Sequence, residues 1–485
     1  MTAPTHPAIG PVLCLSLTLL LSGCSVWEAY TRPALRLPDN YKEGEAYAGW
    51  KPAEPGVATS DARWWQRYED DQLVSLLAAA EQANYSIQIA EANYRQGLAL
   101  ARASRAPQLP AVNGQAAAIR GESGNAGTDN SISLGATASW ELDLWGRIRN
   151  SIAAGEANAE ATAADLAAVK LSVQSALAQS YFQLRILDSQ KLLLDNTAQS
   201  FERSLTLTTN RYNVGLASRT EIAQAETQLR NTRAQAIDIT AARAQLEHAI
   251  AVLIGQPPAT FSLPEQPYRD VATISFPVAP AVLPASLLER RPDIAAAERR
   301  IAQANAQIGV ARAALFPTLS LGAALGFGNN SLNNLLSIPN RIWSLGPSLA
   351  GPIFDNQLRK SQTEAAIARY DASVANYKFT VINGLREVED NLALLRILQA
   401  EAEEQAMAVK FAREAVVQTE NRYRAGISEY QNVVIVQSAL LNAERNLLSI
   451  TGRRLNASVA LMIALGGDYA SAMSSPAQPT PPSAQ

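Results

Sequence analysis

The segment Asn210-Arg211-Tyr212-Asn213-Val214-Gly215 returns later in the chain as Asn421-Arg422-Tyr423-Arg424-Ala425-Gly426. Upstream, the segment from Arg105 to Pro110 returns as Arg312 to Pro317. Single positions near these segments keep the same spacing: Ile87, Ala90, Glu91 and Gln96 recur as Ile294, Ala297, Glu298 and Gln303. An internal duplication of this length predicts two similar units side by side, in a bundle or ring with pseudo-symmetry.

Each repeated turn motif closes a long helical pattern. From Gly146 the chain runs for about 65 residues without a proline, and its apolar residues follow one another at spacings of three and four. The pattern breaks at Gly215, because glycine readily takes the left-handed conformation that ends a helix. Ser218 or Thr220 can then cap a return helix that reaches about Gly255. The second copy predicts the same hairpin, with its turn at residues 425–428 and its return helix ending at Gly466-Gly467.

Two strand-like segments precede each long helix. In the first copy they are residues 112–120 and 131–144, separated by a loop rich in Gly, Ser, Asn and Asp. In the second copy they are residues 318–328 and 341–354. A helical pattern comes before each pair, from Asp71 to about Ala106 with a break at Asn84, and from Asp293 to Pro317.

These patterns divide the chain into six parts. Both repeats have the same plan of a helix, two strands and a long helical hairpin, and a proline-rich connector joins them. The predicted parts are a lipoprotein signal peptide (1–23), an N-terminal anchor and equatorial segment (24–70), repeat 1 (71–255), the connector (256–292), repeat 2 (293–467) and a disordered tail (468–485).

Composition and charge exclude several functions. Lys and Arg total 41 against 44 Asp and Glu, and no run of five or more basic residues occurs, so nucleic acid is not an expected partner. The only histidines are His6 and His248, and no phosphate loop, His-Glu-x-x-His helix or serine nucleophile elbow is present. We therefore expect no enzyme activity, no cofactor and no metal site.

The N-terminus predicts export and a lipid anchor. A short apolar stretch ends in Leu21-Ser22-Gly23-Cys24, and the only other cysteine, Cys14, lies inside that stretch. This ending resembles a bacterial lipobox, in which the cysteine sulfur carries diacylglycerol and the new amine after cleavage is acylated. Several acyl chains hold a membrane far better than one. Ser25 follows the cysteine, which in such lipoproteins indicates sorting to the outer membrane.

The four strands have the length that crosses a bilayer when tilted. Four strands cannot close a barrel, because closed barrels need about eight or more. Open strand edges in lipid leave backbone groups without hydrogen bonds. If these strands enter a membrane, several chains must therefore share one barrel. A water-exposed sheet stays the alternative at this point.

Residues 283–294, which read Leu-Pro-Ala-Ser-Leu-Leu-Glu-Arg-Arg-Pro-Asp-Ile, closely resemble the signature that opens the second repeat of TolC-like outer membrane efflux proteins. Residues 140–147 and the two Arg-Tyr-x-x-Gly turns resemble the same family, closest to its lipid-anchored multidrug-efflux subgroup. The resemblance implies a mainly α-helical homotrimer that shares a 12-stranded outer membrane β-barrel and a long periplasmic α-helical barrel. It also implies passive conduction in a tripartite system of antibiotic resistance, with energy from an inner-membrane pump, expected to be of the resistance-nodulation-division type, reached through a periplasmic adaptor.

The resemblance also assigns roles to the turns. The adaptor contact and the closed end of the channel would lie at Arg211, Tyr212, Gly215, Arg422, Tyr423 and Gly426. Many relatives narrow the channel with rings of aspartate and leucine after the second turn. Here Asn432 and Ile435 stand at the usual aspartates and Gln431 at a usual leucine, which implies weaker cation selectivity. The remaining gate candidates, which could pair across neighbouring hairpins, are Arg219, Glu221, Glu429 and Tyr430.

Two other functions stay open from the sequence. A type I secretion channel for polypeptides shares the fold implied by the resemblance. A periplasmic adaptor or structural lipoprotein made of helical hairpins is an alternative of a different class. Adaptors have a single hairpin, whereas this chain has two hairpins that each follow a pair of strands.

Overall fold

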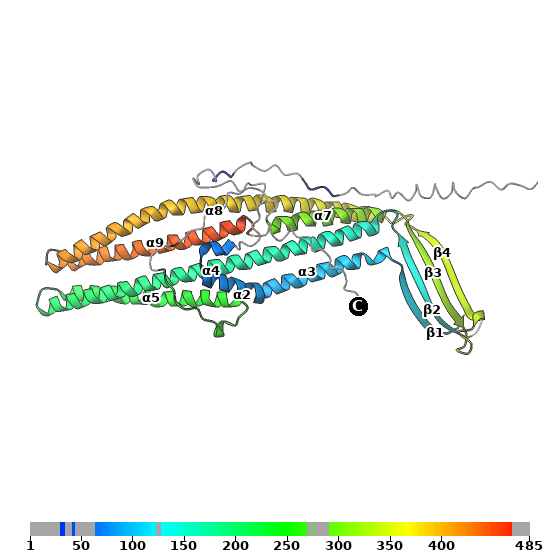
Figure 1. The fold of residues 1–485 in the computed structure, drawn as a ribbon, viewed down its shortest axis with the longest axis horizontal. Helices are drawn as coiled ribbons and strands as arrows, with labels where there is room; N and C mark the ends of the chain where they lie inside the picture. The colour runs from blue at the N-terminus through cyan, green and yellow to red at the C-terminus, as the bar shows by residue number, and fades with distance from the viewer. Residues whose placement is uncertain are drawn as a thin grey trace, which may run out of the picture. The chain divides into compact units, whose positions relative to one another are not determined.

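The computed structural model describes residues 30–33, 41–43, 64–122, 128–268, 274 and 291–467 (Figure 1). The predicted signal peptide, Cys24 and the tail after Gly467 lie outside these ranges, as do most of segment 24–70 and much of the connector. The chain divides into two compact units. The strand unit includes Ala92–Ala164 and Ala295–Phe379, and the hairpin unit includes Arg36–Glu91, Asp165–Ile294 and Thr380–Gln485.

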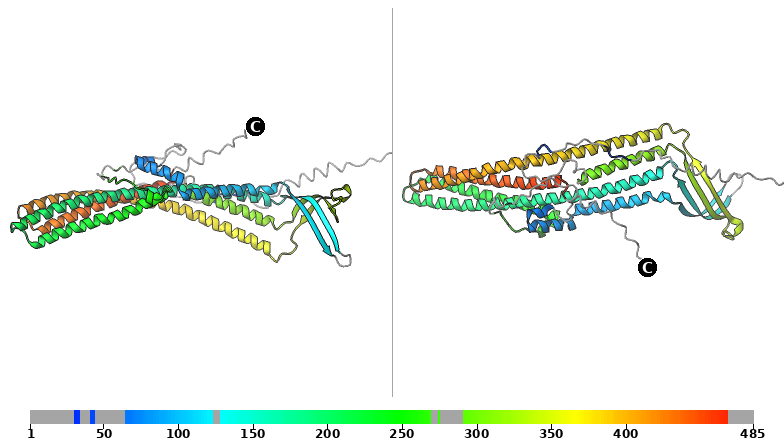
Figure 2. Two further views of the ribbon diagram at one scale, coloured as in Figure 1. Left: turned by 90° about the horizontal axis from the view of Figure 1, so that it is seen from below. Right: turned by 45° about the horizontal axis from the view of Figure 1, so that its top comes forward.

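The strand unit contains one antiparallel sheet in which neighbours in sequence are neighbours in space, in the order β1-β2-β3-β4 (Figure 2). Its strands are β1 (Ala111–Glu122), β2 (Thr128–Leu142), β3 (Thr318–Asn329) and β4 (Arg341–Ala350). Pairing of Leu142 with Leu319 joins the ribbon of the first repeat to that of the second. The four predicted strands are confirmed, and they form a single sheet.

Two strands end earlier than predicted. The last strand ends at Ala350 instead of Phe354, because Gly351 and Pro352 follow and proline cannot donate to a strand ladder. The second strand ends at Leu142 instead of Leu144. The cause is Asp143, whose carboxylate accepts hydrogen bonds from the backbone N–H groups of Ile148 and Arg149 and so fixes the start of the next helix.

The two faces of the sheet differ in character. Residues paired across antiparallel strands point to the same face. On one face Leu134 pairs with Phe327, and Leu325 pairs with Trp343. On the other face the pairs are small or polar: Asn113 with Thr137, Ser320 with Ser348, and Gly322 with Gly346. One face is therefore apolar and the other is small and polar. Almost all residues of β1 and β4 are exposed in the single chain, whereas most residues of β3 are half-buried.

Four helices enter the strand unit: α3 (Tyr85–Ser104), α4 (Arg147–Asn213), α7 (Pro292–Ala313) and α8 (Leu358–Arg424). They pack closely through small side chains such as Ala101, Ala154 and Ala304, all of which are buried. At Gly155 a Cβ atom would lie only 2.8 Å from the Ser104 hydroxyl, so α3 and α4 approach at this point because glycine has no side chain.

The hairpin unit contains the two predicted helical hairpins. Figures 1 and 2 show α5 (Arg219–Leu253) running back along α4, and α9 (Tyr430–Ala464) running back along α8. Helices α4 and α8 each contain 67 residues, and α5 and α9 each contain 35. These equal lengths show that the duplication extends over both helices of the hairpin. None of the helices in the described ranges has the length and apolar character of a bilayer-spanning helix.

The main core of the hairpin unit lies at the base of the hairpins. The 3₁₀ helix Trp64–Tyr68 and α2 (Asp71–Ala83) contribute Trp64, Leu73 and Leu77, which pack against Tyr181 and Phe182 of α4. Asp70 fixes this arrangement, because it caps α2 through the N–H groups of Gln72 and Leu73 and also accepts a hydrogen bond from the Tyr181 hydroxyl at 2.7 Å.

Candidate functional site: the tip of the two helical hairpins

Both hairpins end in the same turn geometry. Gly215 has φ +79° and Gly426 has φ +75°, which is the left-handed conformation predicted for these positions. In the first turn the N–H of Leu216 donates to the carbonyl of Arg211 at 2.7 Å, and in the second Ile427 donates to Arg422 at 2.9 Å. The N–H of Gly215 also donates to the carbonyl of Tyr212 at 2.9 Å, and that of Gly426 to Tyr423 at 3.0 Å. This pair of bonds is the Schellman closure of a helix.

The two return helices begin differently. Ser218 caps α5 in a capping box, in which its side chain accepts from the N–H of Glu221 and the Glu221 carboxylate accepts from the N–H of Ser218. Ser218, and not the alternative Thr220, is therefore the cap. At the equivalent position of the second repeat, Glu429 makes no side-chain capping bond. The first hairpin thus has the more firmly capped tip.

Tyr423 joins the two hairpins of the chain. The Arg211 guanidinium donates to the Tyr423 carbonyl at 2.9 Å and lies 4.7 Å from the centre of the Tyr423 ring. The Tyr423 hydroxyl donates to the Glu221 carboxylate at 3.2 Å and lies 3.2 Å from the Thr208 hydroxyl. Thr208, Arg211 and Glu221 belong to the first hairpin and Tyr423 to the second, so one side chain closes the seam between them.

Burial keeps the tyrosines of the tip protonated. Tyr423 is 3% exposed and Tyr430 is 1% exposed, and their rings lie 5.4 Å apart. Burial raises the pKa of Tyr423, and it raises the pKa of Tyr430 to about 12. The Tyr423 hydroxyl is therefore a hydrogen-bond donor at neutral pH. Within the described ranges the Tyr430 hydroxyl is buried without a partner.

The predicted tip residues fall into two groups. Arg211 and Tyr423 face the seam, whereas Tyr212, Gly215, Arg422 and Gly426 are exposed. Among the gate candidates, Glu221 and Tyr430 both contact Tyr423. The others are exposed at the start of the return helices: Arg219, Glu429, Gln431, Asn432 and Ile435.

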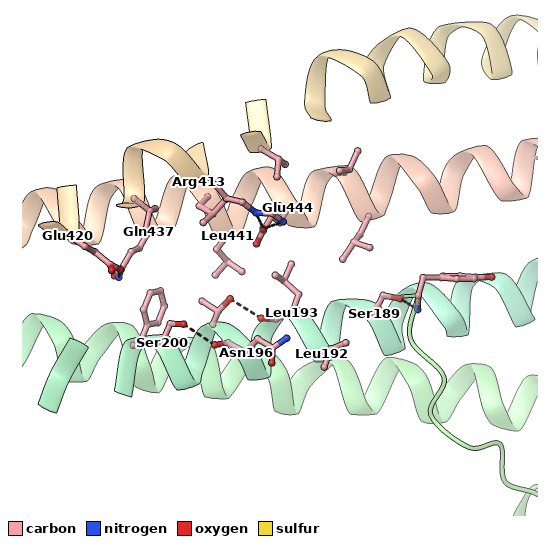
Figure 3. Close-up of a pocket in the computed structure, with 18 residues that line it drawn as sticks. Ser189, Leu192, Leu193, Asn196, Ser200, Arg413, Glu420, Gln437, Leu441 and Glu444 are labelled. Atoms are coloured by element: carbon pink, nitrogen blue, oxygen red, sulfur yellow. Dashed lines mark hydrogen bonds and ion pairs between the residues drawn. The ribbon is translucent and has the colours of Figure 1, made fainter. Parts of the chain in front are cut away.

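A groove of about 420 Å³ lies between α4 and the second hairpin (Figure 3). Phe201, Leu193 and Leu441 line its apolar part, and an ion pair between Arg413 and Glu444 closes one wall at 2.7 Å. No pattern in the sequence predicts this groove. Its residues continue the apolar stripes of the helices, and nothing in their spacing separates a groove from a filled core.

A buried charge network, which was not predicted from the sequence, lies near the base of the first hairpin. Arg185 is 2% exposed and donates to the Pro264 carbonyl at 3.0 Å, while Arg243 donates to the Leu263 carbonyl at 2.7 Å. Both arginines pair with the buried Asp188. The network binds the described start of the connector to α4 and α5. Two arginines and an aspartate within apolar stripes are a signal that could have indicated it.

Arg291 explains part of the Arg-Arg-Pro-Asp signature. Its guanidinium holds Asp293 with two hydrogen bonds of 3.0 and 2.7 Å, Glu387 at 2.7 Å and the Ala464 carbonyl at 3.2 Å. Burial lowers the pKa of Arg291, but the hydrogen bonds and charges of the two carboxylates outweigh burial and raise it overall. This single side chain therefore joins the start of α7 to α8 and to the end of α9.

The comparison with protein families matches this architecture. The family described as "Outer membrane efflux protein" matches residues 76–256 and again 283–467, so each match covers one repeat with its hairpin. The chain belongs to the outer membrane efflux protein family. The double match confirms the resemblance and the internal duplication inferred from the repeated turn motif.

Relatives cover the efflux protein almost from end to end. It is 31% identical over 458 residues to the solvent efflux pump outer membrane protein SrpC of Pseudomonas putida, covering 93% of this chain and 97% of that protein. It is 30% identical over 469 residues to the pyoverdine export outer membrane protein OpmQ of Pseudomonas aeruginosa, with 94% and 96% covered. To the cation efflux protein CusC of Escherichia coli K12 the identity is 27%, with 94% and 99% covered.

Solved structures have the same fold. The outer-membrane channel OprN matches with a TM-score of 0.85 and 28% identity over 92% of this chain and 100% of that chain. A CusC structure matches with a TM-score of 0.82 and 26% identity over 92% and 100%. The efflux protein is thus the outer membrane channel of a tripartite efflux pump and extends into the periplasm. It is trimeric, it acts with pump partners, and it is not an enzyme. The adaptor alternative is therefore wrong.

Proposed function

We propose that the channel passively conducts drugs, organic solvents or other small toxic compounds from a periplasmic adaptor to the cell exterior. The driving energy would come from an inner-membrane pump of the resistance-nodulation-division type. The observation that carries this proposal is the near full-length similarity to proteins named as solvent efflux components. A polypeptide secretion channel has no such support among the relatives described above.

The sheet supports a membrane role for the strand unit. One face presents Leu, Phe and Trp side chains, and the other presents Ser, Thr, Asn and Gly. Strands β1 and β4 each have only one neighbour, so both carry unpaired backbone groups along one edge. Lipid does not tolerate such edges. We propose that three chains pair β1 with β4 of the next chain and close a 12-stranded barrel with the apolar face outward.

The helix turns support an adaptor contact. Val214 is 69% exposed, Leu216 is 68% exposed and Ile427 is 69% exposed. Exposed apolar side chains in tight turns are unfavourable in water and favourable against a partner. Apart from Gly215 and its two chain neighbours, no heavy atom of the described residues lies within 4 Å of where a Cβ would be, so this surface is open. The adaptor would therefore contact the two turns centred on Gly215 and Gly426.

The tip contact can be tested with two substitutions at one position. Gly215→Trp puts a large side chain on the open surface, and Gly215→Asn is the matched control, because asparagine tolerates the left-handed conformation and is small. Both variants should form trimers in the outer membrane. In a host that lacks its own channels but expresses the matching pump and adaptor, Gly215→Trp should abolish resistance to drugs or solvents, and Gly215→Asn should largely keep it.

Normal resistance with Gly215→Trp and Gly426→Trp would reject the adaptor contact at the turns. Conductance in planar lipid films tests the channel separately from its partners. Wild-type trimers without conductance would reject the channel itself, whatever the adaptor does.

We also propose that Cys24 carries the lipid anchor. The support is the Leu-Ser-Gly-Cys sequence at residues 21–24. Labelled palmitate should enter the wild-type protein and not a Cys24→Ala variant, and label retained in that variant would reject the assignment.

A further inference from the structure

The duplicated tip motif provides two equivalent Arg–Tyr pairs, and only one of them forms a contact within the chain. Arg211 and Tyr423 are contact partners across the seam between the two hairpins. Each has an equivalent in the other repeat, because Arg211 corresponds to Arg422 and Tyr423 corresponds to Tyr212. The equivalent residues differ in burial. Tyr423 is 3% exposed, whereas Tyr212 is 41% exposed and Arg422 is exposed.

The receiving site for Tyr423 also has a counterpart in the second hairpin. Tyr423 contacts Thr208, Arg211 and Glu221 of the first hairpin. The equivalent positions are Thr419, Arg422 and Asn432. Two of the three residue types are the same, and the third changes from a carboxylate to an amide that can still accept a hydrogen bond. The second hairpin therefore carries a second receiving site, and no tyrosine among the described residues of the same chain fills it.

We propose that Tyr212 of one protomer docks against Thr419, Arg422 and Asn432 of the neighbouring protomer. In a ring of alternating first and second hairpins, the seam inside a chain and the seam between chains are related by pseudo-symmetry. Arg422 then lies against the ring of the neighbour's Tyr212, as Arg211 lies against Tyr423. This inference rests on the trimeric channel and assigns two of the exposed tip residues to a second copy of the chain.

The seam between chains is the weaker of the two. Asn432 replaces Glu221, and a hydrogen bond to a charged acceptor is roughly twice as strong as one between neutral groups. Arg219 stands where Tyr430 supports the Tyr423 ring, so the docked Tyr212 has a cation of its own chain beside it instead of a buried aromatic ring. The tip should therefore open between protomers before it opens within a protomer.

Cysteine pairs test the proposal on the purified full-length trimer without adaptor. The described residues contain no cysteine, so introduced thiols are unambiguous there. Tyr212→Cys with Arg422→Cys, treated with a short bis-methanethiosulfonate reagent, should give chains linked as dimers and trimers on non-reducing denaturing gels. The matched control, Arg211→Cys with Tyr423→Cys, should react within one chain and give no product of higher mass. Either single variant should also leave monomers.

The outcomes separate the inference from the proposed function. If heat-modifiable trimers are present and the control pair reacts, but the seam pair yields only monomers, the docking of Tyr212 is wrong while the channel stands. If the wild type forms no trimers, both the docking of Tyr212 and the proposed trimeric channel are rejected. A photoreactive phenylalanine analogue at Tyr212 covers the case in which the double variant fails to assemble. It should link to residues 419–432 of another copy, and links to the adaptor alone would overturn the inference.

Discussion

The Tyr423 hydroxyl donates a hydrogen bond to the Glu221 carboxylate at 3.2 Å, although the two residues belong to different repeats. Each residue has its own reason to be in place, because Glu221 is fixed by the capping box of α5 and Tyr423 is buried at the end of α8. The capped turn of one hairpin thus positions the acceptor for the other. The tip of the chain is one connected unit and not two independent hairpin ends.

Removal of this hydrogen bond should loosen the tip. Tyr423→Phe keeps the ring against Arg211 and Tyr430 but loses the bonds to Glu221 and Thr208, which costs about 1 kcal/mol. We expect a higher single-channel conductance and higher sensitivity to a large antibiotic that the outer membrane normally excludes. Thr220→Ala, at an exposed position of the same turn without a capping role, is the control and should leave both unchanged. Unaltered conductance in Tyr423→Phe would contradict a role of this bond in closure.

Asn432 and Ile435, which stand where many relatives carry aspartate, predict a weak block by cations. Gln431, Asn432 and Ile435 are exposed at the start of α9 and carry no charge. Rings of carboxylates bind multivalent cations, and neutral rings do not. Trivalent cations added on the periplasmic side should reduce the single-channel current only slightly. Asn432→Asp should increase the block, and a strong block of the wild type would disprove the prediction.

Gly255→Ala should destabilise the base of the first hairpin. Gly255 has φ +70°, and a Cβ atom there would collide with the backbone carbonyl of Ala83. The conformation alone costs a side chain about 1–2 kcal/mol. Gly215→Ala measures that cost separately, because Gly215 has a similar φ but open space around it. In thermal unfolding followed by circular dichroism, Gly255→Ala should lower the melting temperature clearly more than Gly215→Ala, and equal effects would show that the collision is relieved.

Arg291→Lys should weaken the junction of α7, α8 and α9. Lysine keeps the charge but cannot hold Asp293 with two parallel bonds while also reaching Glu387 and the Ala464 carbonyl. Breaking a fully buried ion pair costs about 3–5 kcal/mol. Asp293 and Glu387 are 38% and 42% exposed, and lysine keeps the charge, so we expect a loss below that range. Arg386→Lys, in an exposed pair with Asp390, is the control and should change stability by less than about 0.5 kcal/mol. Trimer melting in detergent measures both.

Acid should remove the contribution of Glu298. This residue is 3% exposed and accepts hydrogen bonds from the Tyr30 hydroxyl and from Arg299. Burial raises its pKa, but the bonds from Arg299 and Tyr30 and the nearby arginine charges outweigh burial and lower it below its ordinary 4.5. Because the folded-state pKa is the lower one, Glu298 stabilises the fold above about pH 4.5, and the gain is lost as the pH falls through the folded value.

The matching experiment compares wild type with Glu298→Gln. At pH 7 the variant should melt at a lower temperature, because the charge-assisted bonds to Arg299 are lost. Below pH 4.5 the two melting temperatures should converge. A difference that stays constant across this range would mean that the carboxylate charge of Glu298 does not matter.

Local signals were strong enough to predict most of the fold. Gly215 and Gly426 marked the ends of the long helices, and alternation marked the four strands. The sequence could not show which of Tyr212 and Tyr423 is buried. Both occur in the same Arg-Tyr motif, and only the arrangement of the hairpins buries one of them. The place of Arg185 within an apolar stripe hints at burial, but its partners could not be predicted, since the carbonyl group that accepts its hydrogen bond comes from a distant, irregular segment.

The pairing of β2 with β3 has a consequence for how the protein matures. The two strands lie in different repeats, and the entire first hairpin and the connector separate them. During synthesis the β1–β2 pair is made first, and the edge of β2 stays unpaired until the second repeat has been made and exported. The helical hairpins have mostly local contacts and can form earlier. Periplasmic chaperones that shield strand edges should therefore hold an intermediate with folded helices and an unfinished sheet.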